Sequence, residues 1–138
     1  DEVEAAITEA AEAEGASVRE WHVGPVFGDV LGFHQYVVEF DQPPHNAAVF
    51  RRRLDEALMR RNDDYQAHRN PGSGVPSPAL IAARPGTFEG WMRRRGKLGG
   101  QNKVPRMDAG GALTRDLVDY VRGAGMIADE ISVGDSLG

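Results

Sequence analysis

The sequence predicts an α+β domain, in which a small and mainly antiparallel sheet has helices packed on it. Two runs of alternating apolar residues are joined by a short connection bounded by glycines, which is the pattern of an antiparallel hairpin. Other segments place apolar residues at helical spacing and end at glycine or proline. The expected order is helix, hairpin, helix, strand, helix, loop, helix. At this length, residues 1–138 are expected to form one domain.

The predicted sheet consists of the hairpin 17–41 and a short apolar strand over residues 79–84. The first run alternates so that one face would carry Trp21, Val23 and Phe27. The second run, which begins at Phe33, would carry on one face Tyr36, Val38 and Phe40. This half-buried alternation favours a sheet that helices cover on one side.

Two helices are predicted in the first half of the chain. The first ends at Gly15, and its apolar stripe comprises Val3, Ala6, Ile7, Ala10 and Ala13. The second runs over residues 46–61 with Asn46 as its N-cap, and its stripe comprises Phe50, Leu54, Ala57 and Leu58. The stretch 62–65 either continues this helix or caps a short second one.

The second half of the chain predicts two more helices. Thr87 is expected to cap a helix that ends before Gly96 and bears Phe88, Trp91 and Met92. Gly123 is expected to end a last helix, over residues 113–122, whose stripe comprises Leu113, Leu117, Tyr120 and Val121. The helices 46–61 and 113–122 should pack on the sheet, and the tail from Gly125 has no assigned structure.

Composition excludes several classes of function. The chain has no cysteine, which excludes disulfides, zinc–thiolate sites and a cysteine nucleophile. Its longest apolar run, Ala79–Ala83, is far too short for a membrane span, and its acidic start leads us to expect no secretory signal. The net charge of −5 disfavours non-specific nucleic-acid binding. The basic segment 84–106 either meets a small anion such as a phosphate or includes a solvated helix face at residues 93–95.

Common catalytic motifs are incomplete or missing. A phosphate-binding loop needs four residues between its glycines and a hydroxyl after its lysine, but Gly90 and Gly96 enclose five residues and Leu98 follows Lys97. The dinucleotide fingerprint, the serine nucleophile elbow and the H-E-x-x-H zinc motif are also missing. No metal site is predicted, because ligand spacing is lacking among the histidines, His22, His34, His45 and His68.

The stretch GGQNKVPRM, residues 99–107, contains one of the chain's two lysines, Lys103; the other is Lys97. Two further stretches precede it, LDEALMRRNDDYQAHR over residues 54–69 and RPGTFEGWMRRRG over residues 84–96. In this order the three resemble the C-terminal domain of the GH3 family of acyl-acid amido synthetases. The Gly-Gln-x-Lys-x-Pro-Arg element is the most specific of them, and the resemblance covers nearly the whole chain.

The resemblance implies the lid domain of an adenylate-forming enzyme. Such an enzyme activates a carboxylic acid with ATP and Mg²⁺, releases pyrophosphate, and passes the acyl group to an amine, commonly that of an amino acid. A large N-terminal domain of the same polypeptide would hold the nucleotide and the acid. This chain lacks that domain, so we expect it to be inactive alone. The resemblance further implies a cytoplasmic ligase without nucleic-acid or membrane partners.

The same resemblance assigns roles to residues. Lys103 is the implied catalytic residue, since its ammonium group would stabilise the charge that develops as a carboxylate meets the α-phosphate. The residues implied to support the loop or contact the nucleotide are Gly100, Gln101, Pro105 and Arg106. The motif residues expected to be structural are Asn62, Tyr65, Arg69, Gly86, Thr87 and Phe88.

Two alternatives to the ligase stay open. One is a stand-alone binding or regulatory module that keeps the lid fold without catalysis. The other is an α+β interaction domain that binds an acidic partner through the basic segment 93–106, with an affinity that salt weakens steeply. The residues that precede Asp1 in the native gene product would separate the ligase from the module.

Overall fold

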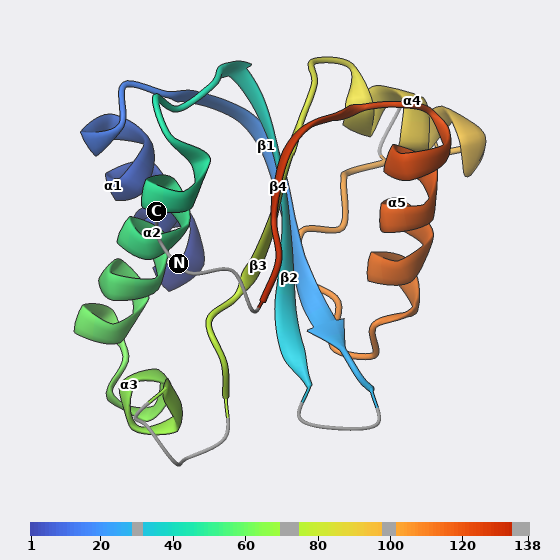
Figure 1. Cartoon of the computed structure of the whole chain (residues 1–138). Helices are drawn as coiled ribbons and strands as arrows, with labels where there is room; N and C mark the ends of the chain where they lie inside the picture. The colour runs from blue at the N-terminus through green and yellow to red at the C-terminus, as the bar shows by residue number, and fades with distance from the viewer. Residues whose placement is uncertain (29–31, 70–74, 98–101, 134–138) are drawn as a thin grey trace.

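The structure is a computed structural model that describes residues 1–28, 32–69, 75–97 and 102–133. Figure 1 shows a central sheet, seen nearly edge-on, with helices on either side. In chain order the elements are α1 (Glu2–Ala13), β1 (Ser17–Val26), β2 (Phe33–Gln42), α2 (Ala47–Arg61), α3 (Asp63–Arg69), β3 (Ala79–Ala83), α4 (Thr87–Arg94), α5 (Ala112–Gly123) and β4 (Ile127–Ile131). The predicted α+β class is confirmed.

The strands form one sheet in the order β1-β2-β3-β4. The predicted hairpin is confirmed, because β1 and β2 pair antiparallel with Trp21 opposite Val38. β3 pairs parallel to β2, and β4 pairs antiparallel to β3. β4 corrects the sequence analysis, which assigned no structure to the tail from Gly125. Its sequence IADEI contains two acidic residues, which are depleted in strands.

Helices cover both faces of the sheet, although the sequence predicted cover on one side only. In Figure 1, α1, α2 and α3 lie on one side, while α4 and α5 lie on the other. The central strands explain this difference. All five residues of β3 are buried, and in β2 Val37 is as fully buried as Val38, whose side chain points to the opposite face. A strand that is apolar on both faces needs cover on both.

The first hydrophobic core lies between the sheet and the helices α1 and α2. Trp21, Val23 and the predicted β2 face pack there against the stripes of both helices. Phe40 of β2 meets Phe50 of α2 edge-to-face, with ring centroids 5.2 Å apart. Full burial of a large apolar side chain stabilises a fold by about 1.5–3 kcal/mol, so this core fixes α2 on the sheet.

The second core lies on the opposite face, beneath α4 and α5. Trp91 of α4 and Leu117 of α5 are fully buried against Val37 and Ile81 of the central strands. This packing confirms that the last predicted helix lies on the sheet.

Two apolar residues predicted to be buried are exposed. Phe27 lies beyond the end of β1 and is 67% exposed. Ala13 is in the last turn of α1 and is also exposed. Both stand at the end of an element, where the opposing layer no longer covers the chain.

Both asparagine caps form as their positions suggested. The Asn46 side chain accepts a hydrogen bond from the Val49 N–H at 3.1 Å, which confirms the start of α2. The Asn62 side chain accepts one from the Tyr65 N–H at 2.9 Å. Asn62 therefore begins α3 rather than continuing α2, and the second of the two predicted alternatives is correct.

Thr87 does not cap α4, contrary to the prediction. Its hydroxyl donates to the Arg84 carbonyl at 2.6 Å, and the N-cap is Gly86, whose φ of 92° favours glycine. The free amides of the helix instead meet the buried carboxylate of Glu39. Its oxygens accept from the Gly86 and Phe88 N–H groups at 2.8 and 2.9 Å, which also places a negative charge at the positive end of the helix.

We predict that Glu39→Gln lowers the free energy of unfolding by about 1–3 kcal/mol. The substitution replaces one carboxylate oxygen by an NH₂ group, so one of the two backbone N–H groups that Glu39 caps loses its acceptor. Urea denaturation of the 138-residue chain measures this loss. Glu89→Gln is the matched control, since Glu89 is an exposed residue of the same helix that pairs with Arg93, and it should change stability by less than about 0.5 kcal/mol. Equal losses in the two variants would contradict the capping role.

Candidate functional site

Lys103 stands on the extended segment between α4 and α5. Its side chain is exposed and forms no ion pair with any described residue. Lys97, which ends the described stretch after α4, is exposed as well. Two residues of the predicted motif, Gly100 and Gln101, lie outside the described residues. The structure thus places Lys103 as a solvent-facing cation on the connection between α4 and α5.

Beyond Lys103, the segment docks on the outer edge of β1. The Val23 N–H donates to the Arg106 carbonyl at 2.8 Å, and the Asp108 N–H donates to the Val23 carbonyl at 3.2 Å. These bonds form a parallel bridge between Val23 and Met107. β1 is an edge strand of the sheet, so the segment uses backbone groups that would otherwise be open to solvent or to other chains.

The buried side chain of His22 also holds this segment, through the backbone of Pro105. The Nδ1 of His22 lies 2.6 Å from the Pro105 carbonyl, and its Nε2 lies 2.8 Å from the Thr114 hydroxyl. A carbonyl only accepts, so Nδ1 carries the proton. The Thr114 hydroxyl lies between Nε2 and the Asp108 carboxylate, which is 3.3 Å from it. The ring is fully buried and meets Trp91 edge-on. Burial lowers the pKa of His22, although the bond to Pro105 acts against this shift.

The approach of α5 to β1 depends on a glycine. A Cβ built on Gly24 would lie 1.8 Å from the Thr114 hydroxyl oxygen, so any side chain there would push the helix away. Thr114 is in turn held by Asp108, whose side chain accepts from the Thr114 N–H at 3.0 Å. The segment, the strand and the helix are therefore interlocked around His22 and Gly24.

Arg106 fixes the outer side of the segment. Its guanidinium donates to Glu20 of β1 and to Glu4 of α1, each at 2.7 Å, and lies over the Trp21 ring at 5.1 Å from its centroid. The guanidinium thus bridges the segment to two elements of the body. Together with the Pro105 carbonyl, these contacts make both residues supports of the segment.

The motif Asn62, Tyr65 and Arg69 gathers around a buried carboxylate. The Tyr65 hydroxyl donates to Asp55 at 2.5 Å, and Arg69 donates to both oxygens of Asp55 at 3.0 and 2.5 Å. Burial, followed by the bond to Asp55, raises the pKa of Tyr65. Asn62 begins α3 and also donates to Glu2 at 2.8 Å. The contacts of this group tie α3 to α2. Asn62 and Tyr65 also line a cavity to which Met107 of the Lys103 segment contributes.

Sequence reasoning did not single out Asp55 or Glu39, and it considered His22 only together with the other histidines, as a possible metal ligand. The burial of Asp55 could have been suspected from the sequence, because it follows Leu54 of the apolar stripe and both are buried in α2. Glu39 and His22 had no such local signal, since their partners lie far away in sequence.

The sequence matches the GH3 family C-terminal domain over residues 1–109, which is most of the chain. This chain belongs to the GH3 family. No curated protein sequence matches it.

Solved structures share the fold of this GH3 domain. A GH3.15 acyl acid amido synthetase has a TM-score of 0.74 and 16% identity, over 98% of this chain and 24% of that chain. AtGH3.15 acyl acid amido synthetase in complex with 2,4-DB has a TM-score of 0.70 and 14% identity, over 97% of this chain and 25% of that chain. This GH3 chain therefore spans about a quarter of the length of these structures, and at such identity the likeness shows the fold alone.

The three arginines at the end of α4 in this GH3 domain contact other side chains of the domain. Arg93 pairs with Glu89 at 3.0 Å and Arg94 pairs with Asp116 at 2.9 Å. Arg95 lies over the Trp91 ring, 4.9 Å from its centroid. These contacts speak against a cluster of free arginines on α4 that would bind an acidic partner. Among the described residues, no helix is long and apolar enough to cross a membrane.

We predict that the free energy of unfolding falls as the pH is lowered from about 7.5 to 5.5. Burial lowers the folded-state pKa of both His22 and His34, whereas the unfolded imidazoles titrate near about 6.5. Below that value the unfolded chain binds more protons than the folded chain, so stability is lost as pH falls. Urea denaturation at several pH values measures the slope, and a flat or rising stability towards pH 5.5 would contradict the burial of neutral rings.

Proposed function

We propose that this chain is the C-terminal domain of an ATP-dependent acyl-acid amido synthetase, which adenylates a carboxylic acid and joins it to an amine. Its membership of the GH3 family and its fold support this proposal. The observation that carries it is Lys103, an exposed cation in the Gly-Gln-x-Lys-x-Pro-Arg element, on a segment whose far end is held by the body of the domain.

Lys103 would act in the adenylation step. A carboxylate oxygen of the acid attacks the α-phosphorus of ATP, and the bond to the leaving pyrophosphate breaks. The two reactants are anions, so their approach is opposed by repulsion. An ammonium group aimed between them stabilises the charge of the transition state. Lysine suits this position because its charge is compact and lies at the end of a long stem, whereas arginine presents a broad fork.

The partner of this domain would be the large N-terminal domain of the same polypeptide, which would hold ATP and the acid. Docking of the two domains would bring Lys103 to the reacting phosphate. In the second step the amine attacks the acyl carbon and AMP leaves. The amine needs access once pyrophosphate has gone, so the C-terminal domain would move between the two steps.

Mg²⁺ would enter this reaction with ATP. Among the described residues, no three His, Asp or Glu side chains are grouped so that they could hold a metal ion. We therefore assign none of the described residues to Mg²⁺, which the large N-terminal domain would hold together with ATP. We also place the enzyme in the cytoplasm, where ATP is supplied.

We predict that Lys103→Ala in the full-length protein slows acid-dependent ATP–pyrophosphate exchange by about 10²–10³-fold, the usual effect of losing one well-aimed electrostatic group, or about 2.7–4 kcal/mol. ATP binding should weaken far less, because the group acts mainly in the transition state. Lys103→Arg should restore little of the rate, since its charge is aimed differently.

Lys97→Ala is the matched control for this experiment. Lys97 carries the same charge, is also exposed and belongs to the same connection between α4 and α5. It should keep nearly the full exchange rate. If Lys103→Ala and Lys97→Ala were equally harmless, the catalytic role of Lys103 would be wrong, and the segment would be an ordinary surface connection.

A further inference from the structure

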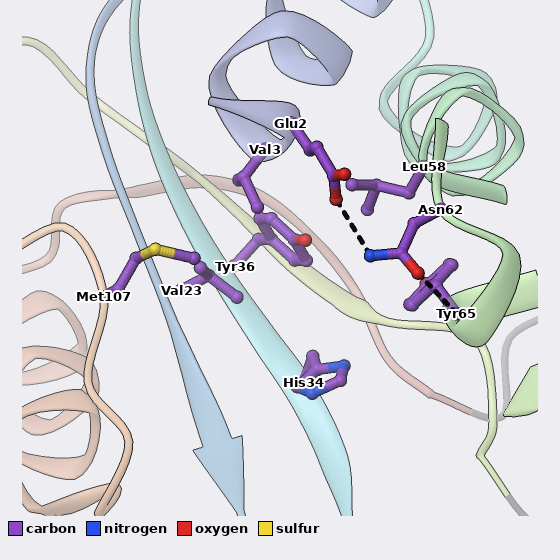
Figure 2. Close-up of a pocket in the computed structure, with 9 residues that line it drawn as sticks. All are labelled: Glu2, Val3, Val23, His34, Tyr36, Leu58, Asn62, Tyr65 and Met107. Atoms are coloured by element: carbon purple, nitrogen blue, oxygen red, sulfur yellow. Dashed lines mark hydrogen bonds between the residues drawn. The ribbon is translucent and has the colours of Figure 1, made fainter. Parts of the chain in front are cut away.

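A cavity of about 250 Å³ opens on the α1–α2 side of the sheet. Figure 2 shows it between β1, β2, the first turn of α1 and the α2–α3 junction. Val3, Leu58 and Met107 contribute apolar walls, and polar groups come from three different elements. Its volume is close to the lower end of the range for small-molecule sites, which are mostly apolar with a few converging polar groups.

The hydroxyl of Tyr36 faces this cavity without a hydrogen-bond partner among the described residues. Tyr36 is only 4% exposed, yet its hydroxyl makes no hydrogen bond to any described residue. In the view of Figure 2, this hydroxyl points toward the pair formed by Glu2 and Asn62. The neighbouring Tyr65 differs, since its hydroxyl is bonded to Asp55. Among the described residues, no fully buried side-chain nitrogen or oxygen lacks a hydrogen-bond partner. The Tyr36 hydroxyl therefore reaches the open space of the cavity, where a ligand could bond to it.

The charge of the lining selects the ligand. Glu2 uses one carboxylate oxygen to accept from the Asn62 amide at 2.8 Å, and its other oxygen has no described protein donor. His34 stacks on the Tyr65 ring, and burial lowers its pKa, which keeps the imidazole neutral. Among the described residues that line the cavity, none is a lysine or an arginine. The lining therefore carries one negative charge and acceptor groups, and lacks a cation for a carboxylate or phosphate.

We propose that this cavity binds a small primary amine that has an apolar body and no carboxylate. The ammonium group would donate to the free oxygen of Glu2 and to the Tyr36 hydroxyl. The apolar body would lie against Val3, Leu58 and Met107. The site is separate from Lys103 and does not depend on the proposed synthetase activity. An amino acid would bind less well, because its carboxylate would meet Glu2 without a compensating cation.

Isopentylamine, isopentanol and leucine form a matched set of probes for this site. The alcohol replaces the ammonium group by a neutral hydroxyl, and leucine is isopentylamine with an added carboxylate. Each is titrated into the isotopically labelled 138-residue chain, and NMR shifts of the amides at Tyr36, His34 and Asn62 report binding. We expect the amine to bind most tightly, with shifts at these residues.

Conservative variants test which groups recognise the ammonium. Tyr36→Phe removes only the hydroxyl, and Glu2→Gln removes the charge but keeps an oxygen for Asn62. Each should weaken binding of the amine by about three- to tenfold, as expected for one lost hydrogen bond or a solvent-accessible ion pair. Tyr120→Phe on α5 and Glu12→Gln at the far end of α1 are the matched controls. Both should bind the amine like the wild type.

The isopentanol titration separates two contributions to binding: the attraction between Glu2 and the ammonium group, and the burial of the apolar body. Glu2→Gln should leave the affinity for the alcohol unchanged while it weakens that for the amine. The proposal is overturned if isopentylamine causes no shifts at the cavity, if leucine or isopentanol binds as tightly as the amine, or if Tyr36→Phe and Glu2→Gln bind it like the wild type.

Discussion

The buried imidazole of His22 is the contact on which the arrangement around Lys103 depends. It joins three parts of the chain that are far apart in sequence: β1, the segment at Pro105, and α5 through Thr114. Both ring nitrogens are engaged and the ring is fully buried, so the segment cannot leave without unpairing a buried polar group. The backbone bonds on either side of Val23 extend this attachment along the edge of the sheet. Lys103 thereby projects from a segment that is part of the folded body.

The fold was predictable where the residues that form an apolar pattern along the chain are also the residues that the structure buries. The stripe of α2 and the alternation of the hairpin are of this kind, and both are confirmed. The sequence analysis predicted helices on one face only, because the alternation in β2 pointed to one buried face. Val37 and the continuous apolar run of β3 indicated that the other face is buried as well. β4 could not be inferred from Asp129 and Glu130, because it forms by pairing with the open edge of β3.

The candidate site was predictable as a motif but not as a geometry. In the sequence Pro105 and Arg106 follow Lys103 closely, and the structure places Lys103 outside and the other two against the body. The partners that hold the segment, such as Glu4 and Thr114, are brought there only by the tertiary fold. The cap that Glu39 supplies to α4 was hidden for the same reason. Sequence patterns report neighbours along the chain, whereas these contacts join distant elements.

Amide hydrogen exchange, measured by NMR on the 138-residue chain, tests most directly whether the Lys103 segment belongs to the folded body. The decisive amides are those of Val23 and Asp108, which bond across the edge of β1 to and from the segment. We predict that both are protected to a degree similar to Val38 in the centre of the sheet, because opening either bond requires His22 to lose its partners. Exchange of Val23 and Asp108 at the rate of an unstructured peptide, while Val38 stays protected, would contradict this view.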